Sequence, residues 1–152
     1  MKKFFLLLTL ILFTIPHCGY SPIYLGNDNI NFDFNIVEID GNDEMNKLFV
    51  SNFKRISSKS AKTKINLIIN TFYTKNILTK NKAGKATSYS LIKKVKFNVI
   101  SANKSQVYNF QEDTKTTSMT SEFELKNYES AIKNNFVNSK IEELIYKLSN
   151  IK

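Results

Sequence analysis

The chain has 152 residues, with 22 Lys and Arg against 13 Asp and Glu, and a formal charge of +9 at pH 7. This length is typical of one modest domain and excludes a multidomain machine, while 42% hydrophobic residues supply a core and argue against intrinsic disorder. All but one of the basic residues are lysines. This bias, together with the many Asn and Ile residues, is typical of AT-rich coding, so the overall charge alone is weak evidence about partners.

The first eighteen residues are typical of a bacterial lipoprotein signal. Lys2 and Lys3 precede an apolar run from Phe4 to Phe13 that is broken only by Thr9. The run is far shorter than the roughly 20 residues of a membrane-spanning helix and fits a cleaved secretory signal. Bacterial processing attaches acyl chains to a cysteine that follows such a run. We therefore expect residues 1–17 to be a signal peptide, Cys18 to be the lipidation site and residues 18–31 to be a lipidated leader.

An acylated Cys18 would anchor the protein on a membrane, because each buried methylene contributes about 0.8 kcal/mol. Gly19 follows in place of the Asp that favours inner-membrane retention, so we expect the outer membrane, on its periplasmic side. The residues before the cysteine are Ile15, Pro16 and His17 rather than the usual Leu and small residues. An uncleaved N-terminal helix is therefore one alternative anchor, and a coincidental cysteine in an ordinary signal is another interpretation.

The mature chain lacks the residues of most enzyme mechanisms. Its one histidine, His17, leaves with the signal, and an acylated cysteine is no longer a thiol. This excludes Ser-His and Cys-His nucleophile pairs and a His/Cys zinc site. The carboxylate pairs 112–113 and 142–143 are sequence neighbours that point apart, and the isolated glycines form no phosphate loop. We expect a protein that is not an enzyme, with no catalytic residues, metal or cofactor.

Hydrophobic periodicity predicts six elements within a single domain over residues 32–152. Alternating apolar residues indicate strands, and apolar residues three or four apart indicate helices. In chain order these are a strand over 32–39, a helix over 43–58, strands over 63–78 and 86–101, a shorter strand over about 105–112 and a helix over about 126–149. Residues 79–85 close a hairpin between the two long strands, and the Thr/Ser-rich segment 113–122 is expected to be a loop or a frayed strand.

Each predicted helix has a single apolar stripe. The economical packing places both helices on one face of a mostly antiparallel four-stranded sheet, which is an α+β two-layer sandwich with the order strand-helix-strand-strand-strand-helix. The other face of the central hairpin carries Ile68, Phe72 and Ile92 among Asn and Lys residues. It is either an ordinary wet face with scattered apolar residues or a surface that a partner covers.

Charge is segregated along the chain. Residues 19–44 hold six acidic and no basic residues, whereas residues 45–111 hold fourteen basic and no acidic residues. Such a field attracts phosphate-bearing ligands. Export and the lack of arginine for bidentate base contacts argue against nucleic acid, and in a Gram-negative envelope the abundant phosphate-rich partner is lipopolysaccharide (LPS). The alternative is a basic face that is merely solvated.

Short motifs add a family resemblance. The segment 18–24, Cys-Gly-Tyr-Ser-Pro-Ile-Tyr, is similar to the Cys-Gly-aromatic-x-Pro-Leu-Tyr opening common in LptE proteins, and Ala-Thr-Ser-Tyr-Ser-Leu over 86–91 opens a strand. With the element order, these motifs make the mature chain resemble the LPS-assembly lipoprotein family LptE. The Tyr-Ala stretch that often precedes the last helix in that family is replaced here by Thr-Ser-Met-Thr-Ser over 117–121.

The resemblance implies a non-catalytic role. The domain would plug the barrel of an LptD-like outer-membrane protein, assist its assembly and help to deliver and insert LPS in the outer leaflet. The implied LPS-binding candidates are Lys80, Lys82, Lys85, Lys93, Lys94 and Lys96, and the barrel-contact candidates are Ile68, Phe72 and Ile92. The alternative is a periplasm-facing lipoprotein that binds a small anionic or lipid ligand without a barrel partner.

Overall fold

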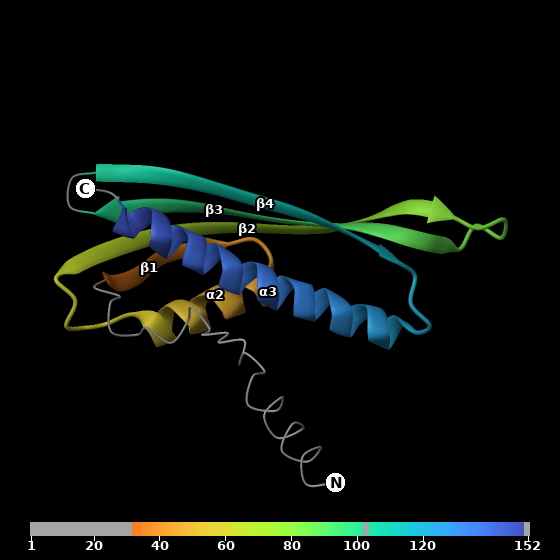
Figure 1. Cartoon of the computed structure of the whole chain (residues 1–152), viewed down its shortest axis with the longest axis horizontal. Coiled ribbons are helices and arrows are strands. Elements are labelled where there is room, and N and C mark those ends of the chain that lie inside the picture. Colours follow the sequence, from red (N-terminus) through yellow and green to blue (C-terminus); the bar gives the residue numbers. More distant parts are fainter. Residues whose placement is uncertain (1–31, 102–103, 151–152) are drawn as a thin grey trace, which may run out of the picture.

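Six elements make up the computed structural model, which describes residues 32–101 and 104–150 (Figure 1). In chain order they are β1 (Phe32–Asp40), α2 (Asp43–Ile56), β2 (Thr63–Lys80), β3 (Ala86–Ser101), β4 (Lys104–Thr117) and α3 (Glu122–Ser149). This order confirms the prediction. The predicted signal peptide, the lipidation site at Cys18 and the leader lie outside the described residues.

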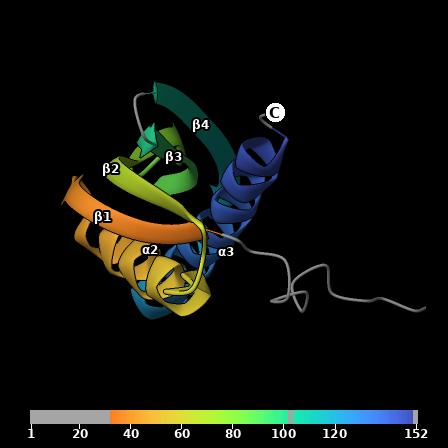
Figure 2. The same cartoon turned by 90° about the vertical axis from the view of Figure 1, so that its left-hand side faces the viewer.

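The four strands form one sheet in the order β1-β2-β3-β4. β1 runs parallel to β2, and the other neighbouring pairs are antiparallel. Figure 2 shows both helices on the same side of the sheet, with β4 at the edge nearest α3. The predicted two-layer α+β architecture is therefore confirmed, and the strand order adds what the residue pattern did not predict. In the described part of the chain no helix is long and apolar enough to cross a membrane.

The connection from β1 to β2 depends on the start of α2. Oδ1 of Asn42 accepts a hydrogen bond of 3.1 Å from the N–H of Met45 and so caps the helix. Acidic residues occupy the first turn and basic residues the last, which complements the helix dipole. Just before the cap, Gly41 has a φ of +107°, and it packs so closely on β2 that a Cβ would lie 1.8 Å from the carbonyl oxygen of Thr71.

An aromatic cluster occupies the centre of the core, between the helices and the sheet. Phe49 and Phe53 of α2 meet the edge of Phe97 on β3, with ring centroids 5.4 and 6.1 Å apart. Phe110 of β4 also packs edge-on against Phe97, at 5.8 Å. From α3 the core receives Phe136 and the apolar residues that follow it. The N-terminal half of α3 adds only Leu125 to the buried apolar residues, so the core lies at one end of the molecule.

Two boundaries differ from the predictions at the last loop. β4 continues to Thr117, in unbroken register with β3 from the Ser101–Lys104 pair to the Ser88–Thr117 pair, whereas the sequence predicts a loop or a frayed strand over residues 113–117. The strand continues because β3 supplies a partner for every residue, although this segment has no apolar alternation. α3 begins at Glu122, earlier than predicted, because the Ser121 hydroxyl accepts a 3.2 Å hydrogen bond from the N–H of Glu124.

Candidate anion-binding and partner-binding surfaces

The β2–β3 hairpin projects beyond the helices (Figure 1). From Lys75 to Lys85 every side chain is exposed, and this length of hairpin carries no acidic residue. Lys80, Lys82 and Lys85, three of the candidate LPS-binding residues, lie together at its tip. None of the three forms an ion pair within the described residues, so their charges face solvent.

The tip has a defined turn. Oδ1 of Asn81 accepts hydrogen bonds from the N–H groups of Ala83 and Lys85, both at 3.0 Å. The carbonyl of Asn81 accepts another from the N–H of Gly84 at 2.9 Å, and Gly84 adopts the left-handed region with a φ of +78°. The turn therefore holds the three tip lysines on a preformed backbone, which reduces the ordering cost of binding.

Lys94 and Lys96 lie elsewhere, on the sheet face opposite the helices. Lys94 is paired with Phe72 across β2 and β3, and its Nζ lies 5.7 Å from the centre of that ring. Lys96 is the next residue on the same face of β3. These side chains border a hollow of about 330 Å³, completed mainly by Asn70, Asn109 and Gln111. A cationic, amide-rich and partly apolar hollow suits a small anion with an apolar portion.

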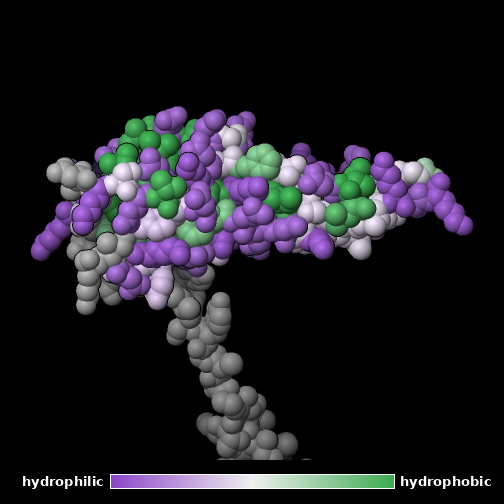
Figure 3. Space-filling view, turned by 90° about the horizontal axis from the view of Figure 1, so that it is seen from above, coloured by the Kyte–Doolittle hydropathy of each residue, from purple (hydrophilic) through white to green (hydrophobic). Residues whose placement is uncertain are grey.

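The barrel-contact candidates share this outer face. Phe72 is 50% exposed, and Ile68 and Ile92 are partly buried. Ile92 pairs with Thr74, one same-face step from the Phe72–Lys94 pair, whereas Ile68 pairs with Asn98 further along the sheet. Val107 on β4 adds an exposed apolar residue, 51% accessible, that the sequence analysis missed. Figure 3 shows such hydrophobic groups scattered among hydrophilic ones, so the face is mixed rather than a continuous apolar patch.

Lys93 does not belong to either lysine group. It is 0% exposed on the helix-facing side of β3, and its Nζ donates hydrogen bonds to Oε1 of Glu112 at 2.6 Å and to Oγ1 of Thr114 at 2.7 Å. The same Nζ lies 5.9 Å from the centre of the Phe136 ring. Lys93 is therefore not available to a surface ligand in this structure. The inclusion of Lys93 among the LPS-binding candidates is corrected here, because α3 covers it.

A second buried cation joins the two helices to the sheet. Lys133 of α3 is 7% exposed, and its Nζ lies 2.7 Å from Oε2 of Glu44 on α2 and 4.1 Å from the centre of the Tyr73 ring on β2. Burial would raise the pKa of Glu44, but hydrogen bonds from Lys133 and Ser130 and the charges of nearby lysines hold that pKa below its usual value. The sequence does not predict this contact, because pairing Lys133 with Glu44 requires the packing of α3 against α2.

Glu129, on α3 like Lys133, makes further polar contacts with the sheet. It accepts a 2.7 Å hydrogen bond from the Tyr73 hydroxyl and forms a 2.6 Å ion pair with Lys75. Burial, and then the hydrogen bond to the negatively charged Glu129, strongly raise the pKa of Tyr73. The N-terminal half of α3 is thus attached to the hairpin base mainly through ion pairs and hydrogen bonds.

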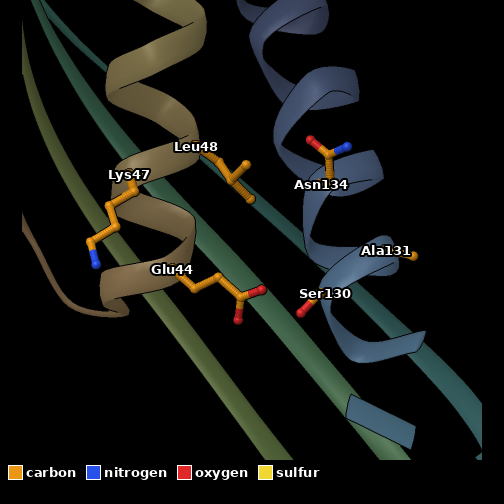
Figure 4. Close-up of a pocket in the computed structure, with 6 residues that line it drawn as sticks. All are labelled: Glu44, Lys47, Leu48, Ser130, Ala131 and Asn134. Atoms are coloured by element: carbon orange, nitrogen blue, oxygen red, sulfur yellow. The ribbon is translucent and has the colours of Figure 1, made fainter. Parts of the chain in front are cut away.

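The groove between the helices is the other hollow of note (Figure 4). It has a volume of about 450 Å³ and is lined by Glu44, Lys47 and Leu48 from α2 and by Ser130, Ala131 and Asn134 from α3. It lies away from the candidate lysines of the hairpin. Within residues 32–101 and 104–150, no three His, Cys, Asp or Glu side chains gather to hold a metal ion.

The comparisons with known proteins identify a shared fold. No family model matches the chain, and no curated protein does. Among solved structures, rare lipoprotein B from Shewanella oneidensis superposes with a TM-score of 0.54 at 13% identity, over 77% of this chain and 98% of that one. An uncharacterized lipoprotein B from Nitrosomonas europaea gives 0.50 at 12% identity, over 80% and 89%. The chain therefore has the fold of these bacterial lipoproteins.

Proposed function

We propose that this protein is a lipid-anchored outer-membrane lipoprotein that plugs an LptD-like β-barrel, assists its assembly and helps to deliver LPS into the outer leaflet. The observation that carries the proposal is the acid-free hairpin, which projects from a fold shared with bacterial lipoproteins and presents Lys80, Lys82 and Lys85 at its tip. The protein acts by binding and positioning, not as an enzyme.

LPS suits this charge pattern because its phosphates lie beside acyl chains. Ammonium groups on a preformed turn pair with phosphates as point charges. None of the three tip lysines forms an ion pair within the described residues, so no internal ion pair must be broken. Lys94 and Lys96, beside the exposed ring of Phe72, form a second cationic and apolar site on the same hairpin. Both groups lie on the β2–β3 hairpin, the first at its tip and the second on β3, so an LPS molecule moving along the hairpin would meet them in turn.

The outer sheet face is the surface assigned to the barrel. Phe72, Ile68 and Ile92 are mixed there with Asn and Lys side chains, a composition that suits the polar interior of a barrel better than a dry protein core. The helix-facing side of the sheet is already used for the core. The outer face is therefore the one that remains for a large partner.

The test is a pull-down of the tagged full chain from gently solubilised outer membranes, with mass spectrometry of the partners and of the N-terminal peptide. Recovery of a large LptD-like barrel together with an acylated Cys18 is the expected result. Recovery of the chain only as a free monomer would overturn the barrel assignment. An unmodified Cys18 would overturn the lipid anchor independently of the partner.

The second candidate function is a lipoprotein that binds a small anionic or lipid ligand without a barrel. The hollow of about 330 Å³ beside Phe72, Lys94 and Lys96 favours it. In that case the purified protein binds such a ligand tightly, and Lys94→Gln with Lys96→Gln abolishes binding. Under the barrel hypothesis the same variant weakens LPS transfer without removing a tight small-molecule site.

A further inference from the structure

We infer that the tip of the β2–β3 hairpin is a membrane-contact finger, in which Ile77 and Leu78 enter the acyl region of an anionic lipid bilayer while the tip lysines hold its phosphates. The finger uses the same lysines as the proposed function, so it describes the protein while its hairpin is not enclosed by a barrel, and it depends on neither a barrel partner nor LPS. It includes two apolar residues to which the proposed function gives no role.

Ile77 and Leu78 are adjacent and exposed, at 51% and 47%. A contact that covered these two side chains would remove their apolar surface from water, which is favourable. The ladder between β2 and β3 is irregular at this point, because the register passes from the Ile77–Tyr89 pair to the Thr79–Ser88 pair and leaves Leu78 without an opposite residue. Such an irregularity bends the strand and redirects side chains.

The lysines near Ile77 and Leu78 favour an anionic bilayer as the partner. Lys80, Lys82 and Lys85 follow within one turn of the hairpin, and no acidic residue occurs between residues 45 and 111. Lysines flanking exposed aliphatic residues are the combination that binds an interface of anionic headgroups above acyl chains. A protein partner that bound this tip would need an acidic patch around an apolar pocket. An anionic bilayer has negatively charged headgroups above apolar acyl chains at every point on its surface.

The position and rigidity of the tip fit the same role. Figure 3 shows hydrophobic groups between hydrophilic ones along the narrow projection. The hydrogen bonds of Asn81 fix the turn, and neither helix covers the hairpin beyond the end of β4, where Ser88 pairs with Thr117 (Figure 1). The finger can therefore reach a lipid surface without moving the core.

The absence of tryptophan from the whole chain allows a direct test. The full chain carrying Leu78→Trp is reconstituted into phosphatidylcholine vesicles with or without phosphatidylglycerol, and tryptophan emission is measured with brominated acyl chains as quenchers. We expect a blue shift and several-fold stronger quenching in the anionic vesicles. Val37→Trp is the matched control, because Val37 is an exposed apolar residue on β1, 60% accessible, and the emission of this variant is expected to stay that of a water-exposed indole.

A second variant tests the role of charge. Lys80→Gln, Lys82→Gln and Lys85→Gln, combined with Leu78→Trp, should remove most of the difference between anionic and neutral vesicles, because each lysine near an anionic surface contributes about fivefold to binding. Equal quenching in the Leu78→Trp and Val37→Trp variants would overturn the inference. So would a blue shift in the anionic vesicles without quenching by brominated lipid, because it would mean that the indole is buried against protein rather than among acyl chains. Neither result bears on co-purification with a barrel, so the two proposals fail separately.

Discussion

Lys93 and Glu112 form an ion pair across β3 and β4 in which one partner is sealed inside the protein and the other reaches solvent. The two charged atoms are 2.6 Å apart, and the side chains are 0% and 44% exposed. Lys93 continues the buried face of β3 between Leu91 and Val95. A single carboxylate and the Thr114 hydroxyl therefore compensate a fully buried cation whose neighbours on the same face of β3 are apolar.

Removing Glu112 should destabilise the protein more than removing Lys93. Glu112→Ala leaves a buried ammonium with one neutral acceptor, at a cost of about 3 kcal/mol, the lower end of the range for a buried pair, because water can enter where the carboxylate was. Lys93→Met keeps the volume and removes the charge, so its cost should be below about 1 kcal/mol. Urea unfolding measures both, and a Lys93→Met variant less stable than Glu112→Ala would contradict this account.

Gly41 should tolerate no side chain. Gly41→Ala places a Cβ 1.8 Å from the carbonyl oxygen of Thr71 at a φ of +107°, so the β1–α2 turn must move and the loss of stability should exceed about 2 kcal/mol. Gly84→Ala is the matched control. Its φ of +78° carries the same type of strain, but nothing lies within 4 Å of the new Cβ, so it should cost only about 1 kcal/mol. Similar thermal shifts for the two variants would contradict the close contact with β2.

Low pH should weaken the packing of α3 against α2, because protonation of Glu44 removes its ion pair with Lys133. The folded-state pKa of Glu44 is held below the usual 4.5, so the stabilisation is present above that pH and is lost as the pH falls through the folded pKa. Glu44→Gln should therefore lower stability at pH 7 and flatten the fall in stability on acidification below about pH 4.5. Glu142 is the control of opposite sign, because burial raises its pKa, and Glu142→Gln should not weaken the protein at pH 7. Unfolding curves at pH 3 to 7 compare the variants.

Much of the fold follows from local pattern. Ile65, Leu67 and Ile69 alternate because one face of β2 is buried, and the same rule predicts β3 at residues 86–101, as observed. The rule fails at the end of β4, where residues 113–117 have no apolar alternation. Their strand conformation comes from long-range pairing with β3. The pairing order of the sheet is likewise a tertiary property that periodicity does not contain.

The residues of the candidate site are harder to predict from the sequence than the strands and helices are. Sequence distance groups Lys80, Lys82 and Lys85, and the hairpin does bring them to one tip. The same criterion groups Lys93 with Lys94, but adjacent strand residues point to opposite faces, and only Lys94 of these two is exposed. The interruption of an apolar face by Lys93 is a visible signal of a buried cation. Its partner Glu112 is not identifiable from the sequence, because pairing requires the register of β4.

Phe72 tests the outer sheet face. Because the ring is 50% exposed, Phe72→Asp should change the free energy of unfolding by less than about 1 kcal/mol while reducing recovery of the barrel in the pull-down. Val37→Asp introduces the same charge at another exposed apolar position, 60% accessible on β1, and should leave recovery unchanged. If neither variant recovered the barrel, a negative charge anywhere on the sheet would disturb the complex. That result would overturn the assignment of the outer face as the barrel-contact surface.

The tip lysines should dominate LPS binding. Replacing Lys80, Lys82 and Lys85 together with Gln should weaken binding of the full chain to LPS by roughly two orders of magnitude if each contributes about 1 kcal/mol at an anionic surface. Lys54, Lys59 and Lys64 are exposed lysines away from the hairpin tip, and replacing them removes the same total charge. Binding of the unsubstituted chain should also fall as salt rises, since exposed charges are screened within about 10 Å at 0.1 M. Equal losses in the two triple variants, with the same salt dependence, would mean that LPS responds to net charge alone and that the preformed turn at Asn81 has no part in recognition.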